Sequence, residues 1–156
     1  WHPDYGKDMT EQNTPAPDWN PEIACFRSAV ARGSLLLKTC KDCGDTHFYP
    51  RSICPFCFSD NTEWRTSSGK GTVYSFSIQR RVPNEYVIAM VTLDEGPTMM
   101  THLVDLPAPE DAKIGQAVEL VFRPGPDGDP LPMFRPRPAP HIPGSRKTRL
   151  PHIFSR

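Results

Sequence analysis

Three kinds of feature are missing from this 156-residue sequence, and each absence narrows the possible functions. The chain has no net charge, because 18 Lys and Arg residues balance 18 Asp and Glu residues. A general polyanion binder usually carries a basic surplus, so non-specific nucleic-acid binding is disfavoured. No apolar run approaches the roughly 18 residues that a membrane span needs, and the first twenty residues are too polar for a signal peptide. We therefore expect no membrane association and a location in the reducing cytoplasm.

The third missing feature is a recognisable catalytic set. The five histidines are scattered, and we find no nucleophile elbow and no glycine-rich loop that would cradle a phosphate. Asp94 and Glu95 fall in a predicted turn, where we expect solvated side chains. An independent enzyme is accordingly disfavoured, and we expect the chain to contribute no catalytic residues of its own.

Cysteine is where the sequence becomes informative, because four of the five form two Cys-x-x-Cys pairs that are ten residues apart. In a reducing compartment, such pairs favour metal binding over disulfides. Two tight turns that face each other complete a tetrahedral site of four sulfurs, which suits zinc. The predicted ligands are Cys40, Cys43, Cys54 and Cys57. Four thiolates leave no open position for water, so the zinc is expected to be structural.

Other uses of these cysteines fit the pattern less well. A thioredoxin-type redox site needs a single pair that opens a helix within a βαβ unit. Iron can occupy the same tetrahedral geometry as zinc. His47 lies between the pairs, where we expect it to pack or to hydrogen-bond near the metal rather than to bind it.

Local patterns predict one helix followed by strands. The helix is expected from Pro21 to Arg32, with proline at its first position and Gly33 as its stop. Its apolar face is formed by Ile23, Phe26 and Val30. After the second cysteine pair, short alternating or apolar segments separated by glycine turns predict about five strands and no helix. Five strands in roughly sixty residues match an OB-type barrel best.

The predicted fold class is therefore mainly β, with an N-terminal helix, a rubredoxin-like zinc ribbon, a five-stranded OB-fold barrel and extended proline-rich termini. The 19 prolines are concentrated toward both ends of the chain. The predicted organisation comprises a flexible N-terminal arm over 1–19, the helix over 20–34, the ribbon over 35–62, the barrel over 63–136 and a basic proline-rich tail over 137–156. We interpret the tail as an arm that docks on a partner, with a disordered basic tail as the alternative.

The order of motifs resembles the DUF35 family of acyl-CoA-associated proteins, which combine a rubredoxin-like zinc ribbon with an OB-fold. The segments that carry the resemblance are LLLKTCKDCGDTHFYPRSICPFC, WRTSSGKGTVYSFSI, VIAMVTLDEGPTMMTHLVD and IGQAVELVF. It covers about residues 19–136. It implies a non-catalytic or co-catalytic subunit in a hetero-oligomer with a thiolase-superfamily enzyme, which is a thiolase, an acyltransferase or an aldolase. Such a complex makes or breaks a carbon–carbon bond beside a CoA thioester, and the partner supplies the catalytic residues.

Acyl-CoA is therefore a possible ligand of this chain, and its phosphates would suit arginine or lysine near a loop. The candidate CoA-binding residues are Arg51, Lys70, Arg80 and Arg81, each of which also fits an ordinary exposed surface charge. The alternative function is a zinc-ribbon and OB-fold protein that binds single-stranded nucleic acid. The zero net charge counts against that alternative.

Overall fold

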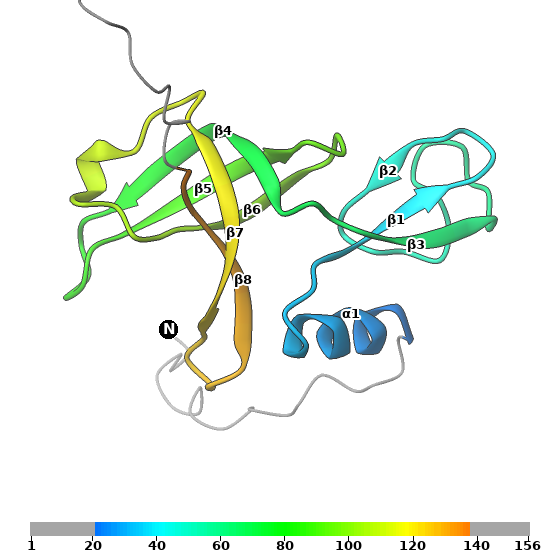
Figure 1. The fold of residues 1–156 in the computed structure, drawn as a ribbon, viewed down its shortest axis with the longest axis horizontal. Helices are drawn as coiled ribbons and strands as arrows, with labels where there is room; N and C mark the ends of the chain where they lie inside the picture. Colours follow the sequence, from blue (N-terminus) through cyan, green and yellow to red (C-terminus); the bar gives the residue numbers. More distant parts are fainter. Residues whose placement is uncertain (1–20, 138–156) are drawn as a thin grey trace, which may run out of the picture.

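A computed structural model describes residues 21–137 of the chain. The predicted N-terminal arm and nearly all of the predicted tail lie outside the described residues. The described part is mainly β and contains one α-helix, a small three-stranded sheet and a closed barrel of five strands, which confirms the predicted fold class (Figure 1). No helix among residues 21–137 is long and apolar enough to cross a membrane.

Helix α1 spans Pro21–Ala31, so it begins at the predicted residue and ends one residue before the predicted Arg32. Gly33 has a φ of 76°, a left-handed conformation that glycine adopts without a steric penalty. Its N–H donates to the carbonyl oxygen of Val30 at 2.9 Å, which satisfies one of the last free carbonyls of the helix. The helix buries Phe26, Ala29 and Val30. Phe26 and Val30 of the predicted apolar face are thus buried, whereas Ile23 is only partly buried.

The small sheet forms the ribbon. Its strands are β1 (Leu36–Cys40), β2 (Thr46–His47) and β3 (Thr62–Thr66), in the order β2-β1-β3. Every residue of β3 is antiparallel to a residue of β1, from Leu36 opposite Thr66 to Cys40 opposite Thr62. The predicted boundary between ribbon and barrel, at residues 62 and 63, therefore falls inside a strand that belongs to the ribbon sheet.

The barrel has the strand order of an OB-fold. Its strands are β4 (Lys70–Gln79), β5 (Tyr86–Leu93), β6 (Thr98–Leu103), β7 (Ala117–Pro124) and β8 (Pro130–Pro136). They close in the order β4-β5-β6-β8-β7, with β7 paired to β4 and with a parallel contact between β6 and β8. A one-turn 3-10 helix, η1 (Pro109–Asp111), lies in the β6–β7 connection.

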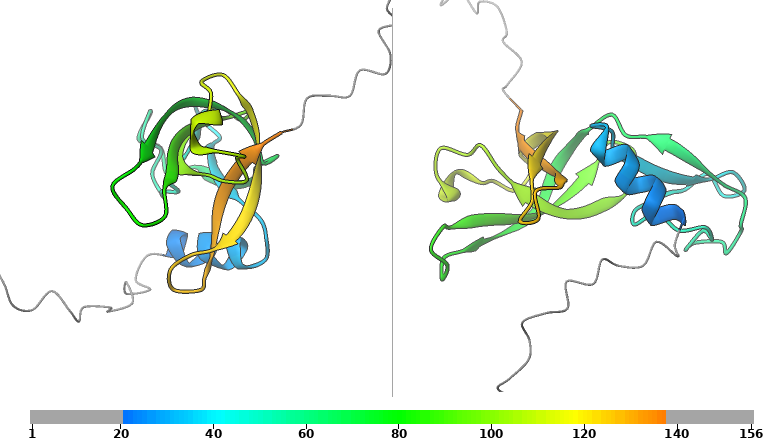
Figure 2. Two further views of the ribbon diagram at one scale, coloured as in Figure 1. Left: turned by 90° about the vertical axis from the view of Figure 1, so that its left-hand side faces the viewer. Right: turned by 90° about the horizontal axis from the view of Figure 1, so that it is seen from below.

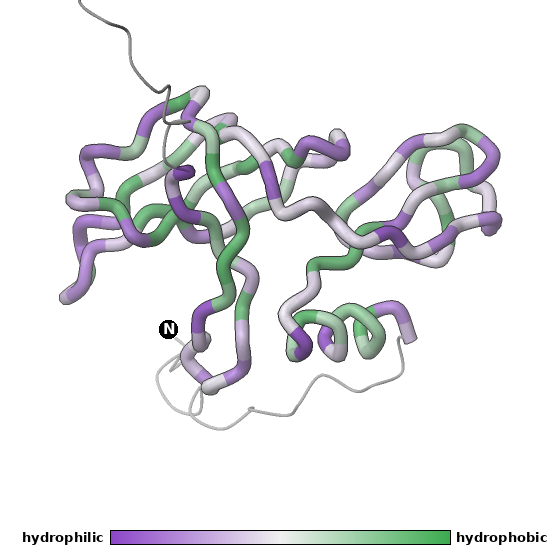
Figure 3. The backbone as a smooth tube through the Cα atoms, in the orientation of Figure 1, coloured by the Kyte–Doolittle hydropathy of each residue, from purple (hydrophilic) through white to green (hydrophobic). Residues whose placement is uncertain are grey.

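One apolar core runs from the helix and the ribbon into the barrel. Its largest fully buried apolar side chains include Leu35 and Leu37 at the start of the ribbon and Val91 and Phe134 in the barrel. Figure 2 shows α1 lying across the junction between ribbon and barrel, and Figure 3 shows the apolar segment that leads from α1 into β1. Since burial of apolar surface stabilises at about 25 cal/mol per Å², this shared core couples the two parts.

A polar clamp also joins the ribbon to the barrel, at residues 67–69 between β3 and β4. Glu95, in the β5–β6 turn, accepts hydrogen bonds from the Ser67 hydroxyl at 3.1 Å and from the Ser68 backbone N–H. Partial burial opposes ionisation of Glu95, but the bonds from Ser68 and Ser67 outweigh it and hold its pKa below the ordinary 4.5. Glu95 is therefore an anchor for the linker, whereas the sequence predicted a solvated turn residue.

We expect Glu95→Gln to lower the free energy of unfolding by about 1 kcal/mol at pH 7, because a charged acceptor of two hydrogen bonds is lost. Since the folded-state pKa lies below the unfolded value, this contribution is present above pH 4.5 and is lost as the pH falls through the folded-state pKa. Urea unfolding from pH 7 to pH 3 measures the difference between the two proteins. The exposed neighbour Asp94→Asn is the control and should behave as wild type. A pH-independent effect of Glu95→Gln would contradict the charge-based explanation.

Candidate metal centre

The four predicted metal ligands converge in the ribbon. All four sulfur atoms lie within 4.8 Å of one another. The Sγ atoms of Cys40 and Cys57 are 3.5 Å apart, and those of Cys43 and Cys54 are 3.7 Å apart. A tetrahedral zinc site with bonds of about 2.3 Å has sulfur–sulfur distances of about 3.8 Å. The arrangement therefore fits a structural zinc ion that is held by four thiolates.

Two turns of matching geometry supply these ligands, the first cysteine turn (residues 39–45) and the second cysteine turn (residues 53–59). In the first, the Gly44 N–H donates to the Cys40 carbonyl at 3.0 Å, and in the second, the Phe58 N–H donates to the Cys54 carbonyl at 3.0 Å. Both donors have left-handed backbones, with φ of 81° at Gly44 and 63° at Phe58. The sequence pointed to this conformation at the glycine, but we missed it at the phenylalanine.

The two ligands of the first cysteine turn differ in acidity. The pKa of Cys40 is lowered to about 7, mainly because the backbone N–H of Cys43 donates to its sulfur and stabilises the charged form. The hydrogen bond from the backbone N–H of Asp45 favours the thiolate of Cys43, but desolvation and the neighbouring sulfurs together outweigh it and raise the pKa of Cys43 to about 12. The thiolate is the form that binds a metal ion. Cys40 and Cys54 are buried, whereas Cys43 and Cys57 are exposed, so the site lies at the surface of the ribbon.

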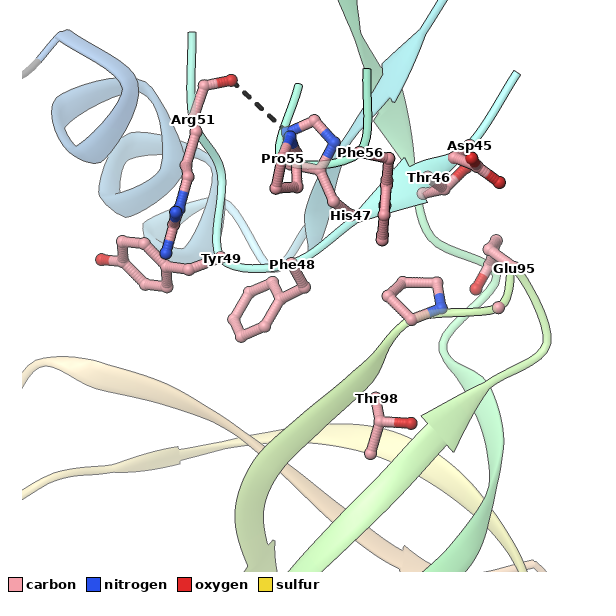
Figure 4. Close-up of a pocket in the computed structure, with 12 residues that line it drawn as sticks. Asp45, Thr46, His47, Phe48, Tyr49, Arg51, Pro55, Phe56, Glu95 and Thr98 are labelled. Atoms are coloured by element: carbon pink, nitrogen blue, oxygen red, sulfur yellow. Dashed lines mark hydrogen bonds between the residues drawn. The ribbon is translucent and has the colours of Figure 1, made fainter. Parts of the chain in front are cut away.

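His47 stands beside the metal centre but outside its ligand set. Its side chain is 3% exposed, and its Nε2 lies 3.5 Å from the carbonyl oxygen of Arg51 (Figure 4). Burial lowers the pKa of this histidine, which keeps the ring neutral at pH 7. The ring therefore packs and hydrogen-bonds within the ribbon, as the sequence predicted.

A hollow of about 420 Å³ separates the ribbon from the β5–β6 turn of the barrel. In Figure 4, Phe48 and Phe56 of the ribbon face Thr98 of β6 across it, and Arg51 and Tyr49 lie at its side. Phe48 packs against Phe26 of α1 at a ring distance of 5.9 Å, which fixes this wall of the hollow. The hollow thus combines aromatic walls with the Arg51 side chain on one side and the carboxylates of Asp45 and Glu95 on the opposite side.

A larger hollow of about 1100 Å³ lies between α1, strands β5 and β6, and the β7–β8 connection. Its walls include Val30, Met99 and Met133, which are apolar. The charged residues at its edge are Arg27 on the helix side and Asp127 and Asp129 on the loop side. Sequence patterns did not indicate this hollow, because it forms between segments that are distant in the chain.

The four candidate CoA-binding residues do not gather in one place. Arg51 lines the smaller hollow. Lys70 and Arg80 lie at opposite ends of β4, about 30 Å apart at the usual rise of a strand. Arg80 forms ion pairs with Glu110 at 2.6 Å and with Glu85 at 3.9 Å, and Arg81 is exposed beside it. Arg51 is thus the one candidate that the described structure places against an aromatic hollow.

Comparison with known proteins assigns the family. Residues 27–63 match the family model of the ChsH2 rubredoxin-like zinc ribbon domain, and residues 64–123 match that of the ChsH2 C-terminal OB-fold domain. A DUF35 domain-containing scaffold protein of Methanocaldococcus jannaschii is 39% identical over 109 residues, covering 65% of this chain and 76% of the relative. The chain belongs to the DUF35 family.

Two further similar proteins carry the names of enzymes, an enoyl-CoA hydratase subunit and an aldolase. A probable enoyl-CoA hydratase alpha subunit of Thermomonospora curvata is 32% identical over 141 residues, which are 83% of this chain and 43% of the relative. The solved structure of the Ltp2-ChsH2(DUF35) aldolase contains a similar chain, with a TM-score of 0.67, 31% identity, and coverage of 78% of this chain and 98% of that one. A DUF35 protein from Sulfolobus solfataricus, at 15% identity and a TM-score of 0.59, shares the fold.

We expect Cys54→Ser to reduce bound zinc from one ion per chain to a small fraction and to unfold the ribbon. The physical reason is that structural zinc contributes about 10–16 kcal/mol of apparent binding energy to comparable small sites. Metal analysis of the purified protein and circular dichroism measure the two effects. Cys25→Ser, outside the cluster, is the matched control and should keep its zinc. A fully folded Cys54→Ser protein without metal would overturn the structural role.

Proposed function

We propose that this chain is a scaffolding subunit that binds a thiolase-superfamily enzyme in the cytoplasm and helps it to hold an acyl-CoA substrate. The reaction of the complex is the formation or cleavage of a carbon–carbon bond beside the thioester. The observation that carries the proposal is a zinc ribbon and an OB barrel joined into one body, in a chain that is 39% identical to a scaffold protein. Its similarity to the DUF35 chain of an aldolase complex supports an enzyme as the partner.

The surface of the described residues is suited to a protein partner. Large apolar side chains are exposed on both parts, among them Phe56 and Phe58 on the ribbon and Met100 on the barrel, at 59%, 80% and 69%. Exposed apolar groups that gather on a soluble protein commonly mark interaction sites. A stand-alone enzyme would instead need a set of reacting groups, and the hollows described above contain no nucleophile paired with a base.

Single-stranded nucleic acid fits this surface less well. Other OB-folds bind oligonucleotides on the face of their second and third strands, beside the loops between the first and second and between the fourth and fifth strands. Here the first of these loops carries Arg80 and Arg81, and Arg80 is already paired with carboxylates. The second loop carries Asp127 and Asp129, and Arg27 is the one basic residue among those that line the larger hollow. Two carboxylates at the edge of a phosphate path oppose binding, because single strands are held largely by cationic contacts.

Contact with CoA is proposed at the smaller hollow. A hollow of about 420 Å³ is within the usual size of small-ligand sites, about 300–1,000 Å³. The aromatic ring of Phe48 suits the adenine ring, and the Arg51 guanidinium, on the side of the hollow away from its two carboxylates, suits a phosphate. Lys70, Arg80 and Arg81 remain candidate contacts, although Arg80 is already paired with carboxylates.

Purification of the native complex tests the partner. The untagged chain, isolated gently from its host, should run with a thiolase-type protein at a fixed ratio, with one zinc per chain by metal analysis. Native mass spectrometry gives the stoichiometry. A chain that is isolated alone, or with bound RNA or DNA, would contradict the proposal.

We expect Arg51→Ala to weaken binding of acyl-CoA to the assembled complex about tenfold, which is the usual loss for one charge-assisted hydrogen bond. Isothermal titration of the complex with a non-hydrolysable acyl-CoA measures the change. Lys41→Ala, a similar loss of charge on the first cysteine turn, should bind as wild type. Equal affinity of all three proteins would place the CoA contact elsewhere.

A further inference from the structure

The two cysteine turns share a backbone geometry but present opposite surfaces. Between its cysteines the first turn carries Lys41 and Asp42, and Gly44 follows the pair. At the corresponding positions the second turn carries Pro55, Phe56 and Phe58. Both turns hold their cysteines in the same backbone geometry. Metal binding therefore does not explain why their other side chains differ.

The two polar side chains between the cysteines of the first turn have partners within the chain. Lys41 pairs with Glu63 of β3 at 3.0 Å. Asp42 accepts hydrogen bonds from the Ser59 hydroxyl and, at 2.8 Å, from the Asn61 amide. These bonds hold the first turn against β3 and fix the end of the second turn. The first turn thus presents a closed polar surface to water.

The second cysteine turn exposes its apolar side chains. Ile53, Phe56 and Phe58 are 52%, 59% and 80% exposed. Within the chain, these three side chains gain little from burial, and none of them is charged. They also stand on a rigid support, because the ligands Cys54 and Cys57 lie in the same turn.

Phe58 is the most informative of the three. Its φ of 63° is left-handed, a region in which a bulky residue is a genuine outlier and which glycine adopts freely. The equivalent position of the first turn is Gly44, where glycine meets the same left-handed backbone requirement without a side chain. A phenylalanine that is unfavourable in its own chain and largely exposed is explained by an interaction with another molecule.

We infer that Ile53, Phe56 and Phe58 form the anchor by which this chain grips the catalytic subunit, inserting into an uncharged apolar depression on that enzyme. The inference rests on the proposed function and deepens it. Phe56 also walls the smaller hollow, so the anchor adjoins the proposed CoA contact, which would place the partner's substrate entrance against Arg51. Interfaces concentrate their energy in a few such aromatic residues that fill pockets on the partner.

The absence of charge from the anchor favours this occupant. The stretch 52–59 contains no charged side chain, and Arg51, which precedes it, is the proposed CoA contact, so the three anchor side chains themselves offer no charge to a phosphate backbone or to an acidic peptide. Three apolar side chains on a metal-rigidified turn suit a preformed protein pocket, since little conformational freedom is lost on binding.

The test uses Phe58→Gly in the full chain with its zinc. Glycine relieves the left-handed backbone, so the melting temperature should equal or exceed that of wild type, and the zinc content should stay at one per chain. Affinity for the co-purified catalytic subunit, measured by biolayer interferometry, should nevertheless fall about 30-fold, the loss expected for a hot-spot aromatic. A variant that is more stable but binds more weakly is the signature of an interface residue.

Two further variants keep the test decisive. Phe56→Ser removes a second ring without changing the special backbone and should weaken binding similarly. Lys41→Ala alters the corresponding place on the first cysteine turn and should bind as wild type. Undiminished affinity of both aromatic variants would overturn the inference while leaving the proposed function intact, whereas a wild-type chain that binds no thiolase-type subunit would remove both. A wild-type homodimer that Phe58→Gly dissociates in sedimentation would make a second copy the occupant and also overturn the inference.

Discussion

The four thiolates that meet at one point are the constraint on which the rest of this structure depends. The ribbon sheet has strands of only five, two and five residues, too little to bury a core of its own. Small β-structures of this size need a metal or disulfides to remain folded. By drawing Cys40 and Cys43 against Cys54 and Cys57, the metal fixes both turns and, through them, the ends of β1 and β3.

The shared apolar core and one carboxylate connect the metal-stabilised ribbon rigidly to the barrel. Phe26 of α1 contacts Phe48 and Tyr49 of the ribbon at ring distances of 5.9 and 5.7 Å, while Leu35 and Leu37 join the same apolar cluster as the barrel strands. Glu95 holds the linker between the two parts from the opposite side. The proposed scaffolding role would use this rigidity, because a partner that touches both parts gains affinity when their relative position is set beforehand.

Features that depend on local chemistry were predictable from the sequence. The spacing of the cysteines gave the metal cluster, Gly33 gave the end of the helix, and glycine-separated strands gave the OB barrel. Features that depend on distant contacts were not predictable in this way. Glu95 reads as a turn residue until the fold places Ser67 and Ser68 against it, and both hollows arise between remote segments. The special backbone of Phe58 did have a local signal in the sequence: this residue follows the second cysteine pair at the position where a glycine follows the first.

Hydrogen–deuterium exchange of the chain, free and in complex with the proposed thiolase-type partner, tests whether the metal-ordered ribbon is the element that holds the enzyme. We expect slower exchange of the amides of residues 51–59 in the complex, with little change in the first cysteine turn and in the buried barrel strands. Identical exchange of the ribbon in both states, with protection confined to the barrel, would contradict it.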